Sequence, residues 1–301
     1  MKRLILAVLG IVAATMMGSA QSYEFVLSDF PMFNGLNISN DFEVTVYPSE
    51  KYSVKFIIEE PYKDYVSANV KGSVLNISLD TKNIPSEVKK AYKGKYAAAF
   101  KVAVSMPLNE MSVIELSDKA VLRFAGEIVT KKMDISLTDN ALLDGITITS
   151  RNATIATDKK SSALVSIATD KLSVAVNSSS SLNLTQTTNK ADINIAGTSN
   201  LTMHGSSDML DFNAKGGAKA SVTGSAASVK FVTSGAVNVD ALNLACDNAE
   251  VTMSGYGNLT ESASKHLKVT LSGGATLIYN NAPVLEVENI KSSSMAKYSS
   301  R

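Results

Sequence analysis

Three aspartates recur at turn positions of this chain and have the side-chain chemistry of a cation site. Asp118, Asp139 and Asp158 are spaced 21 and 19 residues apart. If successive coils of a repeat stack about 4.8 Å apart, these carboxylates form a short column. Such a column suits Ca²⁺, which takes oxygen ligands, or carries raised pKa values through mutual repulsion. The alternative is a solvated turn neutralised by Lys119, Lys159 and Lys160.

Tyrosines supply the second candidate site, because aromatic rings are the usual platforms for glycan or protein binding. Seven of the ten tyrosines precede residue 110. Tyr62 and Tyr65 flank a proline-containing turn, and Tyr92 and Tyr96 lie in a lysine-rich segment. We expect a ligand site at these four residues. The alternative is that their rings cover one end of the core.

The sequence shows no catalytic constellation. Cys246 is the only cysteine, so it forms no intramolecular disulfide, and no acid or histidine neighbours it in a catalytic pattern. His204 and His266 fall in different repeat units, and no carboxylate pair can be assigned. We therefore predict a non-enzymatic protein without a cofactor. The alternative is a carbohydrate-active enzyme, a polysaccharide lyase or hydrolase built on a β-helix. The net charge of +1 gives no case for nucleic-acid binding.

These candidates lie on a repeat that begins near Ser112. Nine units follow at steps of 18 to 21 residues, and the third residue of each unit is apolar throughout, from Ile114 to Val269. A second apolar position recurs eight residues later in each unit, from Leu122 to Leu277. Between them the later units carry glycine, which predicts a corner with positive φ or with no room for a β-carbon. These structural glycines are Gly197, Gly216, Gly235, Gly255 and Gly273.

About 19 residues per unit is one coil of a parallel β-helix, and we predict an all-β, right-handed solenoid. A lone coil cannot offset the entropy of ordering its backbone, so the coils must stack. The predicted organisation is an N-terminal β-rich cap region over residues 21–110, regular coils over 111–282, and a C-terminal cap or tail over 283–301.

The first 20 residues have the pattern of a secretory signal peptide. Lys2 and Arg3 precede an apolar run from Leu4 to Ala14, and small residues lie before a cut after Ala20. The run is too short to span a bilayer comfortably, although Met16 and Met17 would lengthen it into an uncleaved anchor. We expect an exported protein of the periplasm, cell surface or extracellular space, with no membrane span after cleavage.

The order of motifs resembles a known bacterial family, "putative auto-transporter adhesin, head GIN domain". The resemblance rests on the signal peptide, on strand patterns at residues 33–39, 42–46 and 75–79, and on the serial Ser-Gly turns at Ser234, Ser254 and Ser272. It implies an exported β-helical domain with an adhesin-like binding or scaffold role. The partner that we expect is a glycan or a surface protein. Because the given residues up to Arg301 contain no membrane-barrel pattern, we do not expect a self-translocating autotransporter.

Overall fold

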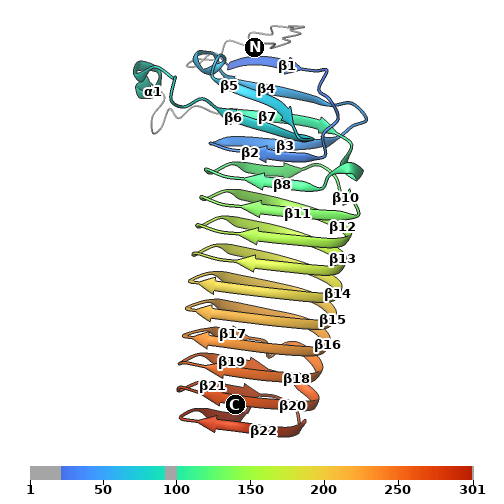
Figure 1. Cartoon of the computed structure of the whole chain (residues 1–301), viewed down its shortest axis with the longest axis vertical. Coiled ribbons are helices and arrows are strands. Elements are labelled where there is room, and N and C mark those ends of the chain that lie inside the picture. The colour runs from blue at the N-terminus through green and yellow to red at the C-terminus, as the bar shows by residue number, and fades with distance from the viewer. Residues whose placement is uncertain (1–21, 92–99, 300–301) are drawn as a thin grey trace.

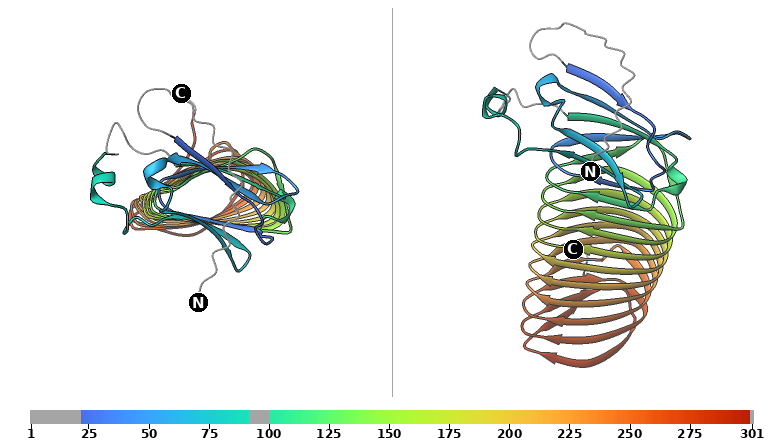
Figure 2. Two further views of the ribbon diagram at one scale, coloured as in Figure 1. Left: turned by 90° about the horizontal axis from the view of Figure 1, so that it is seen from above. Right: turned by 45° about the horizontal axis from the view of Figure 1, so that its top comes forward.

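The computed structural model describes residues 22–91 and 100–299, which form an elongated β-solenoid (Figure 1). It has about 10 turns spaced about 19 residues apart, and the chain follows a right-handed path. The predicted fold class is confirmed. Seen along its axis, the solenoid is a flattened oval with two broad faces (Figure 2).

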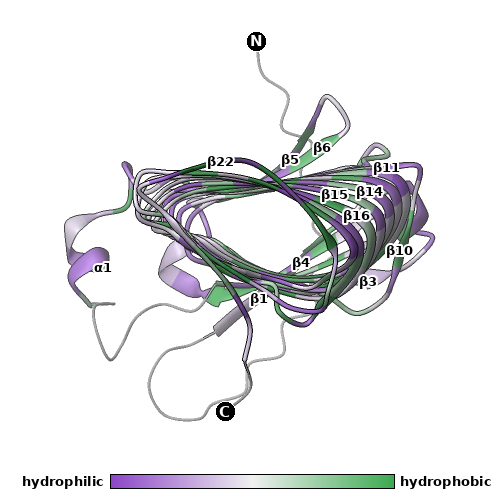
Figure 3. Ribbon diagram, turned by 90° about the horizontal axis from the view of Figure 1, so that it is seen from below, coloured by the Kyte–Doolittle hydropathy of each residue, from purple (hydrophilic) through white to green (hydrophobic). Residues whose placement is uncertain are grey.

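Each broad face of the solenoid is a wall of stacked, hydrogen-bonded strands, and both walls belong to one continuous sheet. We name the β8 face and the β9 face after the strands of the first regular coil. From the N-terminal end, the β8 face contains β5 (Val66–Lys71), β6 (Val74–Leu79), β2 (Gly35–Ile38), β8 (Val113–Leu116), β11 (Lys132–Leu137), β18 (Leu244–Ser254), β20 (Ala263–Ser272) and β22 (Val284–Lys291). The β9 face contains β1 (Ser22–Leu27), β4 (Ser53–Glu59), β7 (Phe100–Met106), β3 (Phe42–Pro48), β9 (Val121–Phe124), β17 (Asn238–Asp240), β19 (Asn258–Glu261), β21 (Thr276–Tyr279) and β23 (Ser294–Lys297). The short strand β10 (Ile128–Val129) lies at the corner between the two faces (Figure 3).

Five long strands in the middle of the solenoid bend around one corner and belong to both faces. They are β12 (Leu142–Thr157), β13 (Ser162–Val176), β14 (Ser181–Gly197), β15 (Asn200–Gly216) and β16 (Lys219–Gly235). Their parallel register places equivalent residues of successive coils beside one another, as Leu172, Ala191 and Leu210 show. Side chains alternate along the strands of the regular coils, so about every second residue enters the core. Figure 3 colours the same coils by hydropathy.

The opposite corner is a tight turn, and the coils build it in two ways. In four early coils two consecutive residues have positive φ: Asp118 and Lys119, Asp139 and Asn140, Lys159 and Lys160, and Ser178 and Ser179. From Gly197 onward a glycine takes the first of these positions, and the five predicted glycines have φ between 76° and 99°. Lys159, a poor fit to such a turn by residue type, nevertheless has a φ of 50°, and its amine lies 3.3 Å from Asp139 of the preceding coil.

The N-terminal region continues both walls of the solenoid. β2 and β3 form one coil, and β6 and β7 form another that stacks above it. The chain therefore passes over the β2–β3 coil before it enters β8. Antiparallel strands β1, β4 and β5 finish this end. The other elements of the described residues are the 3₁₀ turns Glu60–Tyr62 and Leu108–Glu110 and the helix α1 (Ser86–Ala91).

The residues expected to form a C-terminal cap or tail include one more coil. β22 pairs in parallel with β20, and β23 pairs in parallel with β21. All eight residues of β22 are exposed. The alternation of Leu285 and Val287 with Glu286 and Glu288 already has the period of another strand, which explains why the repeat extends past residue 282.

Candidate functional site

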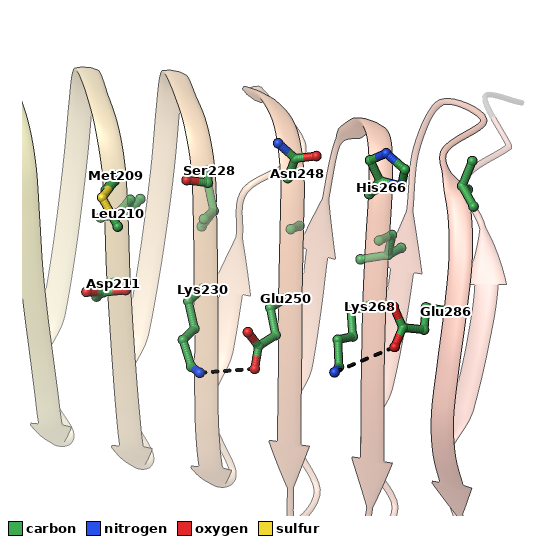
Figure 4. Close-up of a pocket in the computed structure, with 14 residues that line it drawn as sticks. Met209, Leu210, Asp211, Ser228, Lys230, Asn248, Glu250, His266, Lys268 and Glu286 are labelled. Atoms are coloured by element: carbon green, nitrogen blue, oxygen red, sulfur yellow. Dashed lines mark hydrogen bonds and ion pairs between the residues drawn. The ribbon is translucent and has the colours of Figure 1, made fainter.

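A shallow groove of about 410 Å³ crosses the C-terminal half of the β8 face (Figure 4). Five strands, β15, β16, β18, β20 and β22, contribute to it. Each strand supplies two outward residues, since residues two apart on a strand share a face. The pairs are Met209 and Asp211, Ser228 and Lys230, Asn248 and Glu250, His266 and Lys268, and Val284 and Glu286.

The parallel register arranges these residues into two straight rows across the coils. One row, which we call the charged row, contains Asp211, Lys230, Glu250, Lys268 and Glu286. The neighbouring row is mixed in character and contains Met209, Ser228, Asn248, His266 and Val284. Neighbouring strands lie about 4.8 Å apart, so the groove presents a polar group at that interval.

Charges alternate along the charged row and form ion pairs between coils. The amine of Lys230 lies 3.0 Å from Glu250 Oε1, and that of Lys268 lies 2.7 Å from Glu288 and 3.6 Å from Glu286. The hydrogen bond and charge of Glu288 raise the pKa of Lys268, and the hydrogen bond from Lys268 lowers the pKa of Glu288. Both groups are therefore charged at neutral pH. Exposed pairs of this kind are weak, so a ligand can exchange for them at little cost.

The tyrosines that the sequence singled out do not form an exposed platform in the described chain. Tyr62 is only 5% exposed, and its ring packs edge-on against Phe100 with the ring centroids 5.1 Å apart. It belongs to the core, which corrects its prediction as a ligand residue, because the 3₁₀ turn around Pro61 directs the ring inward. Tyr65 is partly buried against the same core. Tyr92 and Tyr96 lie outside the described residues.

The three aspartates do not converge either. Asp139 accepts a hydrogen bond from Thr138 and pairs with Lys159, which matches the neutralised turn considered above. Asp158 lies one turn position earlier than Asp118 and Asp139, and its Oδ1 is buried without a hydrogen-bond partner. Across residues 22–91 and 100–299, no group of three or more His, Cys, Asp or Glu side chains is placed to hold a metal ion.

Calcium should leave the protein unchanged if these corners are neutralised turns. We expect the melting temperature of the mature chain to be the same with millimolar Ca²⁺ as with a chelator, since a ligand that binds the folded state raises stability by mass action. Differential scanning calorimetry measures this. A rise that disappears in Asp139→Asn would instead establish the aspartate column as a calcium site.

The single thiol and one of the two histidines have structural surroundings. Cys246 is buried, and burial raises the pKa of its thiol to about 12, with smaller contributions from Glu261 and Asp247. A thiol in this state is not a nucleophile at neutral pH. His204 shares a hydrogen bond with Thr223 at 3.0 Å on the outer wall. His266 is the histidine that reaches the groove.

Sequence reasoning missed both the groove and an exposed aromatic residue. Tyr256 is 82% exposed at the tight corner, and its ring lies over Gly274, where an added β-carbon would come within 2.7 Å of the ring. A rule that searches for clustered tyrosines overlooks a single ring. The alternation of Asp211, Lys230, Glu250 and Lys268 at one register position was readable from the repeat.

The chain is thus a β-solenoid with a mixed-charge groove on one face. Residues 32–205 and 185–283 match the family model described as "Putative auto-transporter adhesin, head GIN domain", and the chain belongs to this family. The resemblance inferred from the motifs is thereby confirmed. No curated protein matches the chain.

Several solved structures are similar to this one. A "putative adhesin" from Parabacteroides distasonis is 16% identical, with a TM-score of 0.49 over 93% of this chain and 98% of that one. A "putative lipid binding protein" from the same species is 12% identical, with a TM-score of 0.49 over 92% and 97%. A "putative adhesin" from Parabacteroides merdae is 13% identical, with a TM-score of 0.48 over 95% and 100%.

Proposed function

We propose that this protein is an exported, non-enzymatic, adhesin-like protein whose groove on the β8 face binds an uncharged glycan. The charged row carries the proposal. Its fixed alternation of carboxylates and amines offers hydrogen-bond acceptors and donors in turn. A sugar hydroxyl is both donor and acceptor, so a chain of hydroxyls suits such a row. A polymer of one charge would meet a like charge at every second coil.

Membership of the adhesin family supports a role in surface binding. The signal-peptide pattern of residues 1–20, which lie outside the described residues, supports export to the periplasm, cell surface or extracellular space. In the described part of the chain, no helix has both the length and the apolar character needed to cross a membrane.

Rigidity favours binding over catalysis. The groove residues lie on strands held by neighbours on both sides, except at β22, so their spacing is preorganised for a repeating ligand. Polysaccharide hydrolysis needs an acid with a suitably raised pKa beside a second carboxylate. Among the described groove residues, Glu250 and Glu286 are paired with lysines instead.

The proposal predicts retention without cleavage. We expect the mature chain, residues 21–301, to bind members of a neutral glycan array and to release no reducing ends from the same polysaccharides over a prolonged incubation. A matrix-protein array run in parallel tests the protein-partner alternative. Turnover of any polysaccharide would contradict the non-enzymatic assignment, and retention of matrix proteins alone would contradict the glycan ligand.

A further inference from the structure

The C-terminal end of the solenoid exposes side chains that are fully buried one coil earlier. Leu285, Val287 and Ile290 of β22 are 43%, 49% and 41% exposed. Their register partners in β20 have no exposed surface; these partners are Leu267, Val269 and Leu271. The two sets occupy the same position in the coil, so the difference arises only from the cover that a following coil would give.

Strand edges at this end are also unpaired within the described residues. β22 hydrogen-bonds to β20 on one side, and β23 hydrogen-bonds to β21 on one side. Figure 3 views the solenoid from this end, with β22 at the rim. An exposed edge with apolar side chains is a template for another strand.

We infer that two copies of this chain associate through this end, with β22 pairing antiparallel to β22 of the second copy. β22 and β23 lie on opposite faces, and because the chain turns back between them the two strands run in opposite directions in space. A twofold axis perpendicular to the two faces therefore places each strand antiparallel to its own copy. The contact closes on itself, as an isologous interface must.

Charge complementarity favours a second copy of the chain as the partner and defines one register for the β22–β22 pairing. When Val287 faces Ile290 of the other copy, Glu286 faces Lys291 of the other copy. In each match the two side chains lie on the same side of the paired strands. This is possible because Glu288 is an extra residue in the β20–β22 ladder, which shifts the inward–outward alternation of the side chains by one residue. The twofold axis repeats each match, which gives two apolar contacts and two opposite-charge contacts across the edge.

Sedimentation equilibrium of the mature chain measures this association directly. We expect a dimer that dissociates on dilution. Lys291→Glu places two carboxylates opposite each other at both ends of the pairing and should weaken association about tenfold or more. The double variant Glu286→Lys/Lys291→Glu restores opposite charges and should recover most of the affinity.

Lys171→Glu serves as the matched control, because Lys171 is an exposed lysine on the same face, several coils away. It should associate like the wild type. A monomer at all concentrations would overturn the inference. So would a dimer that Lys291→Glu leaves intact, a loss that the double variant fails to recover, or open-ended oligomers, which point to stacking against the N-terminal end.

Discussion

Replacing Gly205 with alanine should destabilise the solenoid by at least about 4 kcal/mol, the range reached only by severe core or backbone defects. Gly205 lies in β15 with φ at 143°, a conformation that side chains rarely adopt. A β-carbon there would overlap the carbonyl oxygen of Gln186 in the preceding coil. Relief requires two hydrogen-bonded backbones to separate, since no flexible side chain is involved. The midpoint of urea unfolding measures the loss.

Gly145 provides the control for backbone strain alone. Its φ is 89°, but an added β-carbon meets no atom within 4 Å. Gly145→Ala should therefore cost only about 1–2 kcal/mol. If Gly205→Ala unfolds at the same urea concentration as Gly145→Ala, the close approach of these two coils is not a constraint on the fold.

Glu261→Gln should stabilise the protein at pH 8 by up to about 3 kcal/mol. Glu261 ends β19 and is 1% exposed. One carboxylate oxygen accepts the Ala263 backbone N–H at 2.8 Å, and the other is buried without a hydrogen-bond partner. Burial raises the pKa of this carboxyl from 4.5 to about 7. Glutamine keeps the acceptor and removes the cost of a buried charge.

The pH dependence has a definite sign. Between pH 4.5 and about 7 the folded carboxyl retains a proton that the unfolded chain has lost. Stability from this group therefore falls as pH rises through that window and is constant above it. Wild type and Glu261→Gln should unfold at similar urea concentrations at pH 4 and diverge toward pH 8. The control is Glu115→Gln at an exposed glutamate, which should unfold at the same urea concentration as the wild type at every pH. If the wild type gained stability relative to Glu261→Gln between pH 5 and 8, the carboxyl of Glu261 would not be the group responsible.

The repeat predicted the solenoid because the physical cause of the fold is periodic. Inward positions such as Ile135, Ile155 and Val174 recur at one register position, and each must be covered by the next coil. The order of the first coils could not be predicted in the same way. β2 and β3 precede β6 and β7 in the sequence but stack between them and the β8–β9 coil, an arrangement that depends on long-range pairing.

Site prediction failed where it depended on side-chain direction. Tyr62 lies in a turn that reads as exposed, and only the packing on Phe100 reveals that it is buried. The aspartate column failed by one residue, because Asp158 precedes the left-handed pair of its turn whereas Asp118 and Asp139 begin theirs. A shift of one residue along a strand turns a side chain to the other face. An error of one residue in the repeat register therefore leaves the predicted fold unchanged but places a predicted ligand residue wrongly.

Glycan binding by the charged row of the groove can be tested with two double variants compared in one binding titration. The groove variant is Lys230→Ala/Glu250→Ala. The matched control is Lys132→Ala/Asp134→Ala, which removes an exposed ion pair of 2.6 Å from the same face, outside the groove. Each retained glycan from the array is titrated against both and against the wild type.

We predict that wild type and control bind equally and that the groove variant loses about tenfold or more in affinity, as expected when hydrogen bonds to charged groups are removed. Equal affinity of all three proteins, or no glycan retained by the wild type, would show that the charged row is not a glycan-binding site.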